Sequence, residues 1–344
     1  MRVGLIAPPW VPVPPPNYGG TEEVVDQMAR GLQANGHDVV LFTTGDATCP
    51  VPRKSVFATA PEDMNFSMPE CRHVQAAYEE FTNCDVIHDH TTVGPIWAQA
   101  SGTTTPIVVT VHNPFTPVSS PVYRRIAAFA SIVAISRSQR ESAPDVRVSA
   151  VIPHGIDPKR YRPGRGAGGF ALFLGRFAPE KGAAAAIRIA RKAAVPLVIA
   201  AKMRTQEECD YFDAEIRPEI GPDVTFAGEV TASERDALLR EAIALINPIT
   251  WREPFGLVMI EALAHGTPVI AYPNGAAPEI IEDGVTGFLA DDESDATTAL
   301  SRVDTIDRNR CRAAVEGYFS ARRMVHDYER LYQRVVSGSG LRTG

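Results

Sequence analysis

The chain has 344 residues, of which 44% are hydrophobic and 22% are charged, and its formal net charge is −7. This composition is typical of a soluble globular enzyme, and the length allows two sizeable cores, so we expect two domains. The acidic balance argues against a nucleic-acid-binding protein, and no apolar run is long enough to span a membrane.

The N-terminus and the cysteines together indicate a cytoplasmic protein. The apolar residues 3–7 are followed by six prolines between Pro8 and Pro16, with no small-residue cleavage site, so we expect a first strand and no signal peptide. The five cysteines are scattered singly, without a C-x-x-C pair. Isolated thiols fit a reducing compartment better than a disulfide framework or a zinc site.

Strands alternate with helices along the first half. We expect a helix over residues 21–35, with Val24, Val25, Met28 and Leu32 on one side. Near-continuous apolar runs, as in parallel sheets covered on both faces, predict strands over residues 3–7, 38–43, 85–88, 107–111, 131–135 and 148–152.

A second αβ series follows a turn-rich joint at residues 153–158 and a Gly/Arg/Pro linker at 162–169. Strands are expected over residues 170–174, 197–201, 224–227, 242–247 and 267–271. Helices are expected over residues 179–194, 207–217, 232–240 and, from Gly256, up to Gly266. A last helix is expected over residues 321–336.

Two carboxylates, Glu253 and Glu261, bracket the start of the helix at Gly256. Backbone N–H groups near Phe255, Gly256 and Leu257 lack intrahelical partners, and the helix dipole adds partial positive charge there. The segment therefore offers an anion site beside two acceptors for sugar hydroxyls. The alternative is a capped surface helix with two solvated acids.

This segment resembles the C-terminal signature of glycosyltransferase family 4, E-x-F-G-(x)4-E-A-(x)3-G-x-P-V followed by P-E-I and D-G-x-T-G-F/L-L. The matching residues run from Glu253 to Val269, then Pro278-Glu279-Ile280 and Asp283 to Leu289. The resemblance implies the α/β fold called GT-B, with two facing doubly wound Rossmann-like domains and an interdomain cleft. It also implies that the last helix crosses back onto the first domain, although a helix capping the second domain is an alternative.

By this resemblance, residues 1–157 and 321–338 form an N-terminal, acceptor-side domain, and residues 158–320 form a C-terminal domain that binds a nucleotide sugar. Arg176 and Lys181 follow a strand and match G-R-(x)3-x-K-G. Strand ends in doubly wound sheets meet the ligand, and the resemblance assigns both cations to the donor's diphosphate. The alternative is a helix start with exposed charges, although cations oppose the dipole there. We expect both side chains to face solvent.

A metal site is not expected. Asp89 stands alone between two histidines, and residues 291–293 are an acidic run that we expect to be solvated. Without a cage of oxygen ligands, the protein cations are better placed to stabilise the leaving diphosphate.

Gly19 and Gly20 lie between the first strand and the first helix, where paired glycines let the backbone approach a ligand closely. They resemble the family's Gly-Gly loop beneath the donor, and we expect Thr21 to cap the helix. In the stiff, proline-rich segment before them, Trp10 and Tyr18 offer flat faces for an acceptor. The alternative is that Trp10 packs the loop onto its own domain.

Three histidine motifs stand at predicted strand ends. His88 and His90 form an H-x-H pair that suggests a metal, but no third ligand is near and the resemblance carries none, so we favour structural or cleft-lining roles. His112 matches the family's T-x-H, whose histidine contacts the transferred sugar. His154 stands where the family usually has Asn, with similar hydrogen-bonding capacity.

These features predict a retaining, metal-independent hexosyltransferase without a cofactor. Its donor is expected to be a nucleotide-diphosphate sugar, with a UDP-sugar favoured and GDP-mannose as the other option. The hydroxyl acceptor could be a glycan, a lipid-linked glycan or a small molecule. Arg124-Arg125 and the pair Arg137 and Arg140 give slight evidence of peripheral membrane contact. The alternatives are a nucleotide-sugar epimerase or hydrolase on the same fold, and a non-catalytic nucleotide-sugar binding protein.

Overall fold

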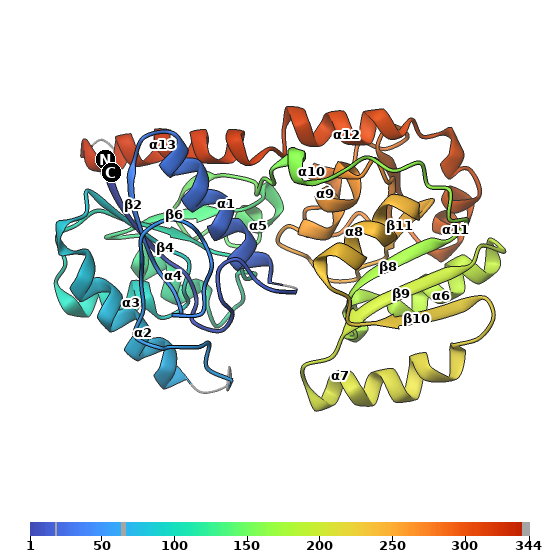
Figure 1. Ribbon diagram of the computed structural model, residues 1–344, viewed down its shortest axis with the longest axis horizontal. Coiled ribbons are helices and arrows are strands. Elements are labelled where there is room, and N and C mark those ends of the chain that lie inside the picture. The colour runs from blue at the N-terminus through green and yellow to red at the C-terminus, as the bar shows by residue number, and fades with distance from the viewer. Residues whose placement is uncertain (18, 63–66, 339–344) are drawn as a thin grey trace. The chain divides into compact units, whose positions relative to one another are not determined.

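The computed structural model describes residues 1–17, 19–62 and 67–338, and these divide into two compact units (Figure 1). Unit 1 contains Met1–Gly155 together with the last helix, α13 (Ala321–Val336). Unit 2 contains Ile156–Ser320.

Unit 1 is built on a parallel sheet that, in the described residues, has seven strands in the order β3-β2-β1-β4-β5-β6-β7. Six of them coincide with the expected apolar runs, and the seventh, β3, is a two-residue strand of exposed cations that carries no apolar signal. The strands are β1 (Arg2–Ile6), β2 (Asp38–Phe42), β3 (Arg53–Lys54), β4 (Val86–Asp89), β5 (Ile107–Thr110), β6 (Ser131–Ala134) and β7 (Val148–Val151).

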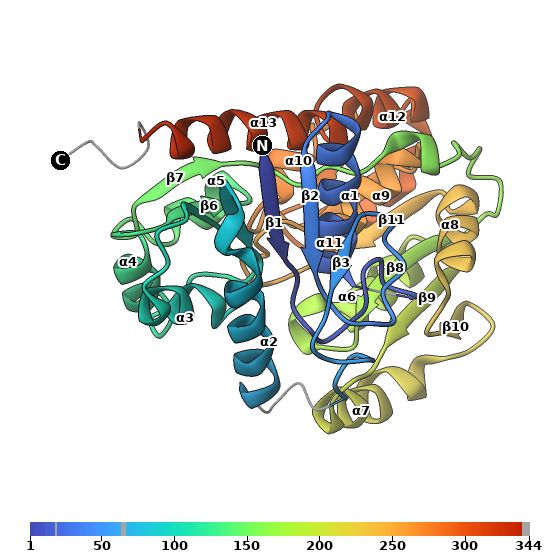
Figure 2. The same ribbon diagram turned by 60° about the vertical axis from the view of Figure 1, so that its left-hand side comes forward.

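Helices cover both faces of this sheet. On one face the apolar core joins the strands to α2, α3 and α4, with Val74 and Tyr78 packed near Ile87 and Val109. On the other face α1 and α13 lie side by side, as Figures 1 and 2 both show. The helices are α1 (Gly20–Ala34), α2 (Ser67–Glu80), α3 (Gly94–Ser101), α4 (Ser120–Ile126) and α5 (Arg137–Glu141), with a 3₁₀ turn at Phe81–Asn83.

Helix α13 packs on unit 1 through the stripe that its helical periodicity predicts. Its buried residues include Val325, Tyr328, Leu331, Tyr332 and Val335, which recur at spacings of three and four. The contact with α1 is close, because a Cβ atom at Gly31 would lie 2.5 Å from Cγ2 of Val325. A larger residue at position 31 would therefore push the two helices apart.

Unit 2 has a second parallel sheet, with the strand order β10-β9-β8-β11-β12-β13 among the described residues. The strands are β8 (Ala171–Arg176), β9 (Leu197–Lys202), β10 (Val224–Gly228), β11 (Ala244–Asn247), β12 (Val269–Ala271) and β13 (Gly287–Leu289). The helices are α6 (Ala183–Lys192), α7 (Gln206–Tyr211), α8 (Ala232–Glu241), α9 (Leu257–Ala264), α10 (Ala277–Ile280), α11 (Glu293–Ser301) and α12 (Arg308–Gly317).

Two expected helices of unit 2 are interrupted. The segment expected as a helix over 179–194 is a 3₁₀ turn at Pro179–Lys181 followed by α6, because Gly182 adopts a φ of 81° between them. The segment expected over 207–217 begins as α7, continues as a π-helix over Phe212–Ile216 and ends as a 3₁₀ turn at Arg217–Glu219.

Each sheet has a topological switch point, at which the chain order of neighbouring strands reverses. In unit 1 the chain order reverses between the adjacent strands β1 and β4, and in unit 2 between β8 and β11. Ligands of doubly wound sheets bind beyond the carboxyl ends of such strands. The loops after these four strands are therefore the places to look for a site.

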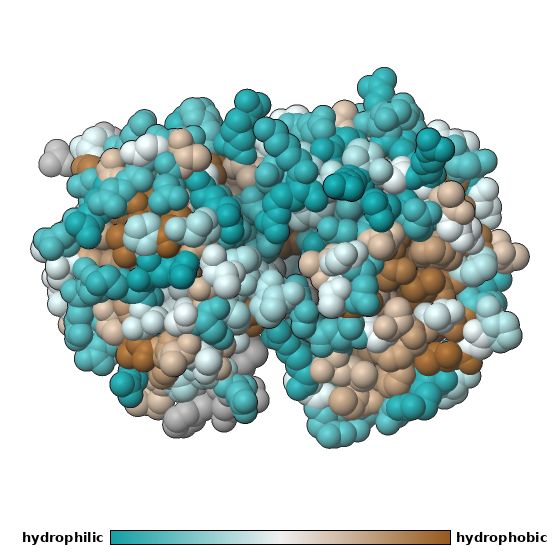
Figure 3. All heavy atoms as spheres, viewed as in Figure 1, coloured by the Kyte–Doolittle hydropathy of each residue, from teal (hydrophilic) through white to brown (hydrophobic). Residues whose placement is uncertain are grey.

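One face of the molecule has a largely polar surface. On the face shown in Figure 3, hydrophilic residues predominate and apolar residues form separate groups among them. Of the helices in the described part of the chain, none is both long and apolar enough to cross a membrane. All five cysteines are free thiols.

Candidate functional site

In unit 2 the structure brings two predicted site residues into direct contact. Nζ of Lys181, in the loop after β8, lies 2.6 Å from Oε2 of Glu253, in the loop after β11. The same loops are joined by a backbone hydrogen bond of 3.0 Å, which the N–H of Thr250 donates to the carbonyl of Glu180. The two loops at the switch point are thus held together by an ion pair and a backbone hydrogen bond.

Lys181 is less exposed than we expected. Only 15% of its side chain is accessible, and its Nζ lies 5.2 Å from the centroid of the Trp251 ring. The expectation that it faces solvent is wrong, because the ion pair with Glu253 and the aromatic face of Trp251 draw the ammonium group inward.

Arg176 also has a carboxylate partner. Its Nη1 lies 2.6 Å from Oε1 of Glu208, and 40% of the arginine side chain is exposed, as expected. Glu208 is buried and accepts a further hydrogen bond of 2.6 Å from the backbone N–H of Arg204. An anion that reaches Arg176 and Lys181 must therefore share or replace two carboxylates.

The side chain of Glu261, on α9, is buried and does not face solvent. It is 5% exposed, and its Oε1 is 3.0 Å from Nη1 of Arg235 on α8. The alternative of two solvated acids is therefore wrong for Glu261, which is committed to an interhelical ion pair.

The start of α9 keeps the geometry of an anion site. Gly256, with a φ of 95°, precedes the first helical residue, Leu257, and no side chain caps this end. Gly256 and Leu257 are partly exposed, while Phe255 is buried and packs 6.2 Å from the ring centroid of Phe319. Phe255 thus anchors the loop beside the partly exposed start of the helix, where the first backbone N–H groups have no partner within the helix.

A third loop fixes the backbone of Glu253. The N–H of Ala276 donates a hydrogen bond of 3.0 Å to the Glu253 carbonyl. A Cβ atom at Gly275, which has a φ of 60°, would lie 2.2 Å from the same oxygen. Only glycine fits this approach, so the Pro273–Pro278 loop positions Glu253.

In unit 1 the paired glycines begin the first helix. α1 starts at Gly20, and Gly19 is the N-cap residue, without a side-chain cap. The prediction that Thr21 caps the helix is wrong, because the helix begins one residue earlier and places Thr21 inside it. A Cβ atom at Gly19 would lie 2.8 Å from both Pro15 and the Glu22 carboxylate, so the loop is tightly packed.

Four histidines lie in contact at the carboxyl ends of β4, β5 and β7. The ring centroids lie 4.0 Å apart between His88 and His90, 5.2 Å between His90 and His112, and 5.2 Å between His112 and His154. Nδ1 of His90 and Nε2 of His112 are 2.9 Å apart and share a hydrogen bond. We call these four residues the histidine stack.

Burial keeps the histidine stack neutral. It lowers the pKa of His88 to about 3 and that of His112 to about 4. The pKa values of His90 and His154 are lowered too, by burial first and by neighbouring imidazoles second. Near pH 7 each ring therefore carries a single proton, and its position is set by hydrogen bonds.

In the described structure the H-x-H pair, His88 and His90, does not offer one unpaired ring nitrogen from each residue to a metal ion. Both nitrogens of His88 are used, since Nδ1 lies 2.6 Å from Oη of Tyr332 and Nε2 lies 2.7 Å from Oγ1 of Thr110. This agrees with the structural role that we favoured for His88.

The acidic residues considered for a metal also have structural contacts. Asp89 is fully buried and accepts hydrogen bonds from Oη of Tyr78 and from Thr91. Asp291 and Asp292 are exposed, as expected of a solvated run, and Asp292 also caps α11 by accepting from the backbone N–H groups of Ser294 and Asp295. No group of three or more His, Cys, Asp or Glu in the described ranges could hold a metal ion.

The proposed acceptor residues are only partly described. Trp10 is half-buried, between the surface position and the core position that we considered. Tyr18 lies outside the described residues. The segment between them is anchored at Val13, which is buried and whose carbonyl accepts from the backbone N–H groups of Thr48 and Cys49.

Models of known families match both halves of the chain. A model described as "Glycosyltransferase Family 4" matches residues 18–160, and one described as "Glycosyl transferases group 1" matches residues 164–315. The chain belongs to glycosyltransferase family 4. It is thus an enzyme that transfers a sugar, and its two Rossmann-like units form a GT-B fold.

Relatives of known name are similar over most of the chain. A phosphatidyl-myo-inositol mannosyltransferase of Mycolicibacterium smegmatis is 26% identical, covering 99% of this chain and 96% of the relative. An "MMP alpha-(1->4)-mannosyltransferase" of Mycolicibacterium hassiacum is 28% identical, covering 71% of this chain and 66% of the relative.

Solved structures share the fold. AviGT4, a glycosyltransferase involved in avilamycin A biosynthesis, is 26% identical with a TM-score of 0.74, covering 98% of each chain. HepE of Anabaena, in complex with UDP and glucose, has a TM-score of 0.77 at 19% identity, covering 97% of this chain and 99% of HepE.

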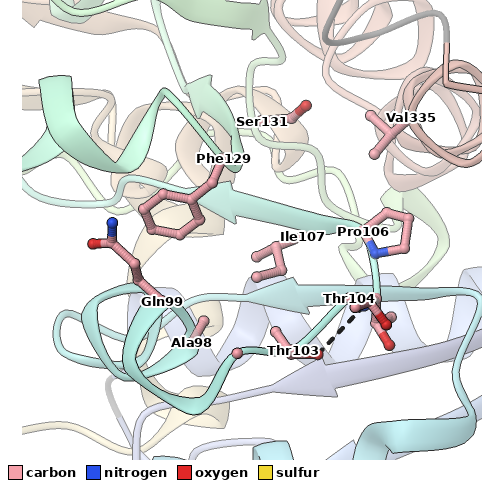
Figure 4. Close-up of a pocket in the computed structure, with 11 residues that line it drawn as sticks. Ala98, Gln99, Thr103, Thr104, Pro106, Ile107, Phe129, Ser131 and Val335 are labelled. Atoms are coloured by element: carbon pink, nitrogen blue, oxygen red, sulfur yellow. Dashed lines mark hydrogen bonds between the residues drawn. The ribbon is translucent and has the colours of Figure 1, made fainter.

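A cavity of about 290 Å³ lies away from the switch points of this family 4 enzyme (Figure 4). Its lining includes Ile107 and Ser131, which begin β5 and β6, together with Phe129 and Val335. It is therefore at the amino ends of these strands, opposite to the ends that hold the histidine stack. We do not assign it to the transfer reaction.

Sequence reasoning missed the partners of the predicted residues. Glu208, Arg235 and Trp251 each contact a predicted cation or carboxylate, and Gly275 supports Glu253. Each of them lies 22 to 70 positions along the chain from the predicted residue that it contacts, so no local motif indicates them. The histidine stack was seen as separate motifs, since its members span residues 88–154.

Proposed function

We propose that this family 4 enzyme is a retaining, metal-independent hexosyltransferase that uses a nucleotide-diphosphate sugar. The observation that carries the proposal is the contact of 2.6 Å between Lys181 and Glu253, with Arg176 at the end of the same strand, β8. It brings two cations and the start of α9 to one switch point, where an anionic ligand would be expected.

The proposed chemistry separates charge. The bond between the anomeric carbon and the phosphate oxygen breaks, so negative charge develops on the leaving diphosphate. Arg176, Lys181 and the N–H groups at the start of α9 stabilise that charge more in the transition state than in the ground state. Lys181 would exchange Glu253 for a phosphate oxygen, which leaves the carboxylate free to accept from a sugar hydroxyl.

Retention of configuration is inferred from the family resemblance. In this scheme the acceptor oxygen bonds to the anomeric carbon on the face that the phosphate leaves, and the acceptor's proton passes to a phosphate oxygen. The products are a glycoside and a nucleoside diphosphate. Neutral His112 would donate an N–H to a hydroxyl of the transferred sugar and so fix its position.

The donor is proposed from the relatives. The mannosyltransferase names favour mannose as the transferred sugar, and hence GDP-mannose. A UDP-sugar, which the sequence favoured, stays the other option. The HepE complex with UDP and glucose is below 25% identity, so we take only the fold from it.

The test is a donor and acceptor assay on the purified chain. Thermal shift with UDP-glucose, UDP-N-acetylglucosamine and GDP-mannose selects the donor, because a ligand of the native state raises the unfolding midpoint. Nucleoside diphosphate release is then measured with and without phosphatidyl-inositol vesicles, and the anomeric configuration of the product is read by NMR.

The outcomes separate the candidate functions. Acceptor-dependent release with a product of the donor's own configuration supports a retaining transferase. Donor turnover that needs no acceptor would indicate a hydrolase or epimerase, and binding without turnover would indicate a binding protein. An inverted product would contradict the retaining assignment.

We also propose peripheral membrane contact for a lipid-linked acceptor. Val118 is 84% exposed and Val122, on α4, is 40% exposed, and the cations Arg124 and Arg125 follow on the same short helix. Exposed apolar side chains beside cations suit an anionic bilayer surface. Sedimentation with anionic vesicles should fall for Val118→Asp/Val122→Asp and persist for Met68→Asp, an exposed apolar residue on α2; equal binding by all three proteins would refute the contact.

A further inference from the structure

The proton shared within the histidine stack can be placed by counting hydrogen-bond partners. His90 is buried, at 4% exposure, and its Nδ1 lies 2.9 Å from Nε2 of His112. The other nitrogen of His90, Nε2, is buried without a hydrogen-bond partner in the described part of the chain. One hydrogen atom lies between Nδ1 of His90 and Nε2 of His112, and it could be covalently bonded to either nitrogen.

The two arrangements differ in what they bury. If His112 donates from Nε2, the proton of neutral His90 sits on its own Nε2, and an N–H is buried without an acceptor. If His90 donates from Nδ1, only a lone pair is buried at that nitrogen. Buried N–H groups without partners are rarer than buried acceptors without partners, so the second arrangement is favoured.

The second arrangement also fixes His112. With Nε2 accepting from His90, neutral His112 carries its proton on Nδ1. The His112 residue is partly exposed, and among the described residues Nδ1 has no protein partner. His112 therefore presents an N–H donor, and not a lone pair, to a ligand at the carboxyl end of β5.

The remaining contacts hold His90 in place. Its ring stacks on His88 at 4.0 Å, and His88 is held at both nitrogens by Tyr332 and Thr110. Strand geometry puts His88 and His90 on the same face of the sheet, two residues apart, while Asp89 points to Tyr78 on the other face. His90 thus has one orientation available for its bond to His112.

We propose that His90 is a positioning residue that sets the tautomer of His112, so that Nδ1–H of His112 donates to a hydroxyl of the transferred sugar. The tautomer assignment rests on the unliganded geometry. The assignment of the sugar as the acceptor of this hydrogen bond rests on the proposed function.

The first test needs no substrate. Long-range ¹H–¹⁵N correlation spectra of ¹⁵N-histidine-labelled protein distinguish protonated from bare ring nitrogens, and the signals of His112 are those lost in His112→Asn. We expect a single tautomer, protonated at Nδ1. A wild-type His112 that is protonated at Nε2 would overturn the proposal.

Two variants of the same shape test the role of His90. In His90→Asn an amide N–H can donate from the place of Nδ1, whereas His90→Leu has no donor there. We expect His112 to keep its Nδ1–H tautomer in His90→Asn and to show a mixture of tautomers in His90→Leu. An unchanged tautomer in a folded His90→Leu protein contradicts the proposal.

Kinetics with UDP-glucose and GDP-mannose connect the tautomer to function. We expect kcat/KM to fall roughly 10-fold or more in His90→Leu, to stay within about threefold in His90→Asn, and to show no further loss when His90→Leu is added to His112→Ala. His73→Gln, another buried histidine outside the stack, serves as the control and should keep wild-type kinetics.

Equal losses in the Asn and Leu variants, with unchanged tautomers, would assign His90 a packing role only. If the wild-type protein turns over none of the three donors of the thermal-shift panel, the proposed function fails, while the spectra still decide the tautomer.

Discussion

At the scale of single residues, each cation proposed to bind phosphate is already paired with a carboxylate. Lys181 is held by Glu253 and Arg176 by Glu208, both at 2.6 Å. A positive charge at a helix start is unfavourable without such a partner. In the unliganded site both cations are therefore held in ion pairs, and a diphosphate that binds as we propose would replace the carboxylates as their partner.

Arg176→Ala should lower turnover on the order of 10²–10³, as expected for a donor aimed at charge that develops in the transition state. The fold should survive because 40% of this side chain is exposed. Turnover is compared with that of Arg217→Ala, an exposed arginine of the same unit that pairs with Asp213. Equal activity of the two variants would remove Arg176 from the site.

A second prediction concerns Trp10, which we propose as a residue that contacts the acceptor. If its half-buried ring contacts the acceptor, Trp10→Ala raises KM for the acceptor, while donor affinity and the unfolding midpoint stay near the wild-type values. Steady-state kinetics and thermal unfolding are the measurements. A loss of several kcal/mol of stability together with donor binding would make Trp10 a core residue instead.

The site residues at the strand ends could be predicted from the sequence, but the residues that contact them could not. Arg176 and Lys181 follow a strand in a recognisable spacing, and so does His112. Glu208 meets Arg176 only because α7 follows the neighbouring strand β9, and the burial of Lys181 depends on Trp251 in another loop. Such contacts are set by the packing of elements.

At the scale of elements, periodicity predicted the long and regular ones. The stripe of α13 and the apolar strands of both sheets give clear signals. The short helices α3, α4 and α5 do not, since five to eight residues carry at most two turns of pattern. α2 is longer, but it buries Glu70 and His73 along its apolar side, which obscures the pattern.

Helix α13 also supports the histidine stack, which gives a third prediction. Tyr332→Phe removes the hydroxyl group whose oxygen lies 2.6 Å from Nδ1 of His88 and leaves that nitrogen unpaired in the core. We expect a loss of about 1–3 kcal/mol in the free energy of unfolding, measured with urea.

Tyr318→Phe is the matched control, because Tyr318, the C-cap residue that follows α12, is 50% exposed. It should change stability by less than about 0.5 kcal/mol. A Tyr332→Phe protein as stable as this control would show that the hydrogen bond to His88 contributes little.

At the scale of the whole molecule, buried neutral histidines predict acid sensitivity. Burial lowers the pKa of His73 to about 4, from an ordinary value of 6.5, and the histidine stack is shifted the same way. The unfolded chain then binds more protons below pH 6.5, so stability is complete above that pH and falls as the pH drops toward about 4.

One carboxyl group acts in the opposite sense. Burial raises the pKa of Asp89 to about 6, so the folded state gains a proton there between pH 6 and 3.8, which partly offsets the histidines. Because several histidines oppose one aspartate, the net effect is destabilisation by acid.

The measurement is the unfolding free energy between pH 7 and pH 5. His73→Gln, whose amide can replace the hydrogen bond of 2.9 Å to the Ala7 carbonyl, should show a shallower decline, by up to about 1.4 kcal/mol per pH unit near pH 5. An identical slope in the variant would mean that His73 titrates normally in the folded protein.

The central claim is that protein cations, and no metal ion, stabilise the departing diphosphate. It is tested most directly by nucleoside diphosphate release in excess EDTA, from the donor that the panel selects, by the wild type and by Arg176→Ala/Lys181→Ala. We predict full wild-type turnover with the chelator and a loss of at least 10² in the folded double variant. Turnover that disappears with EDTA and returns with Mg²⁺ or Mn²⁺, or near-normal turnover by the double variant, would contradict the account.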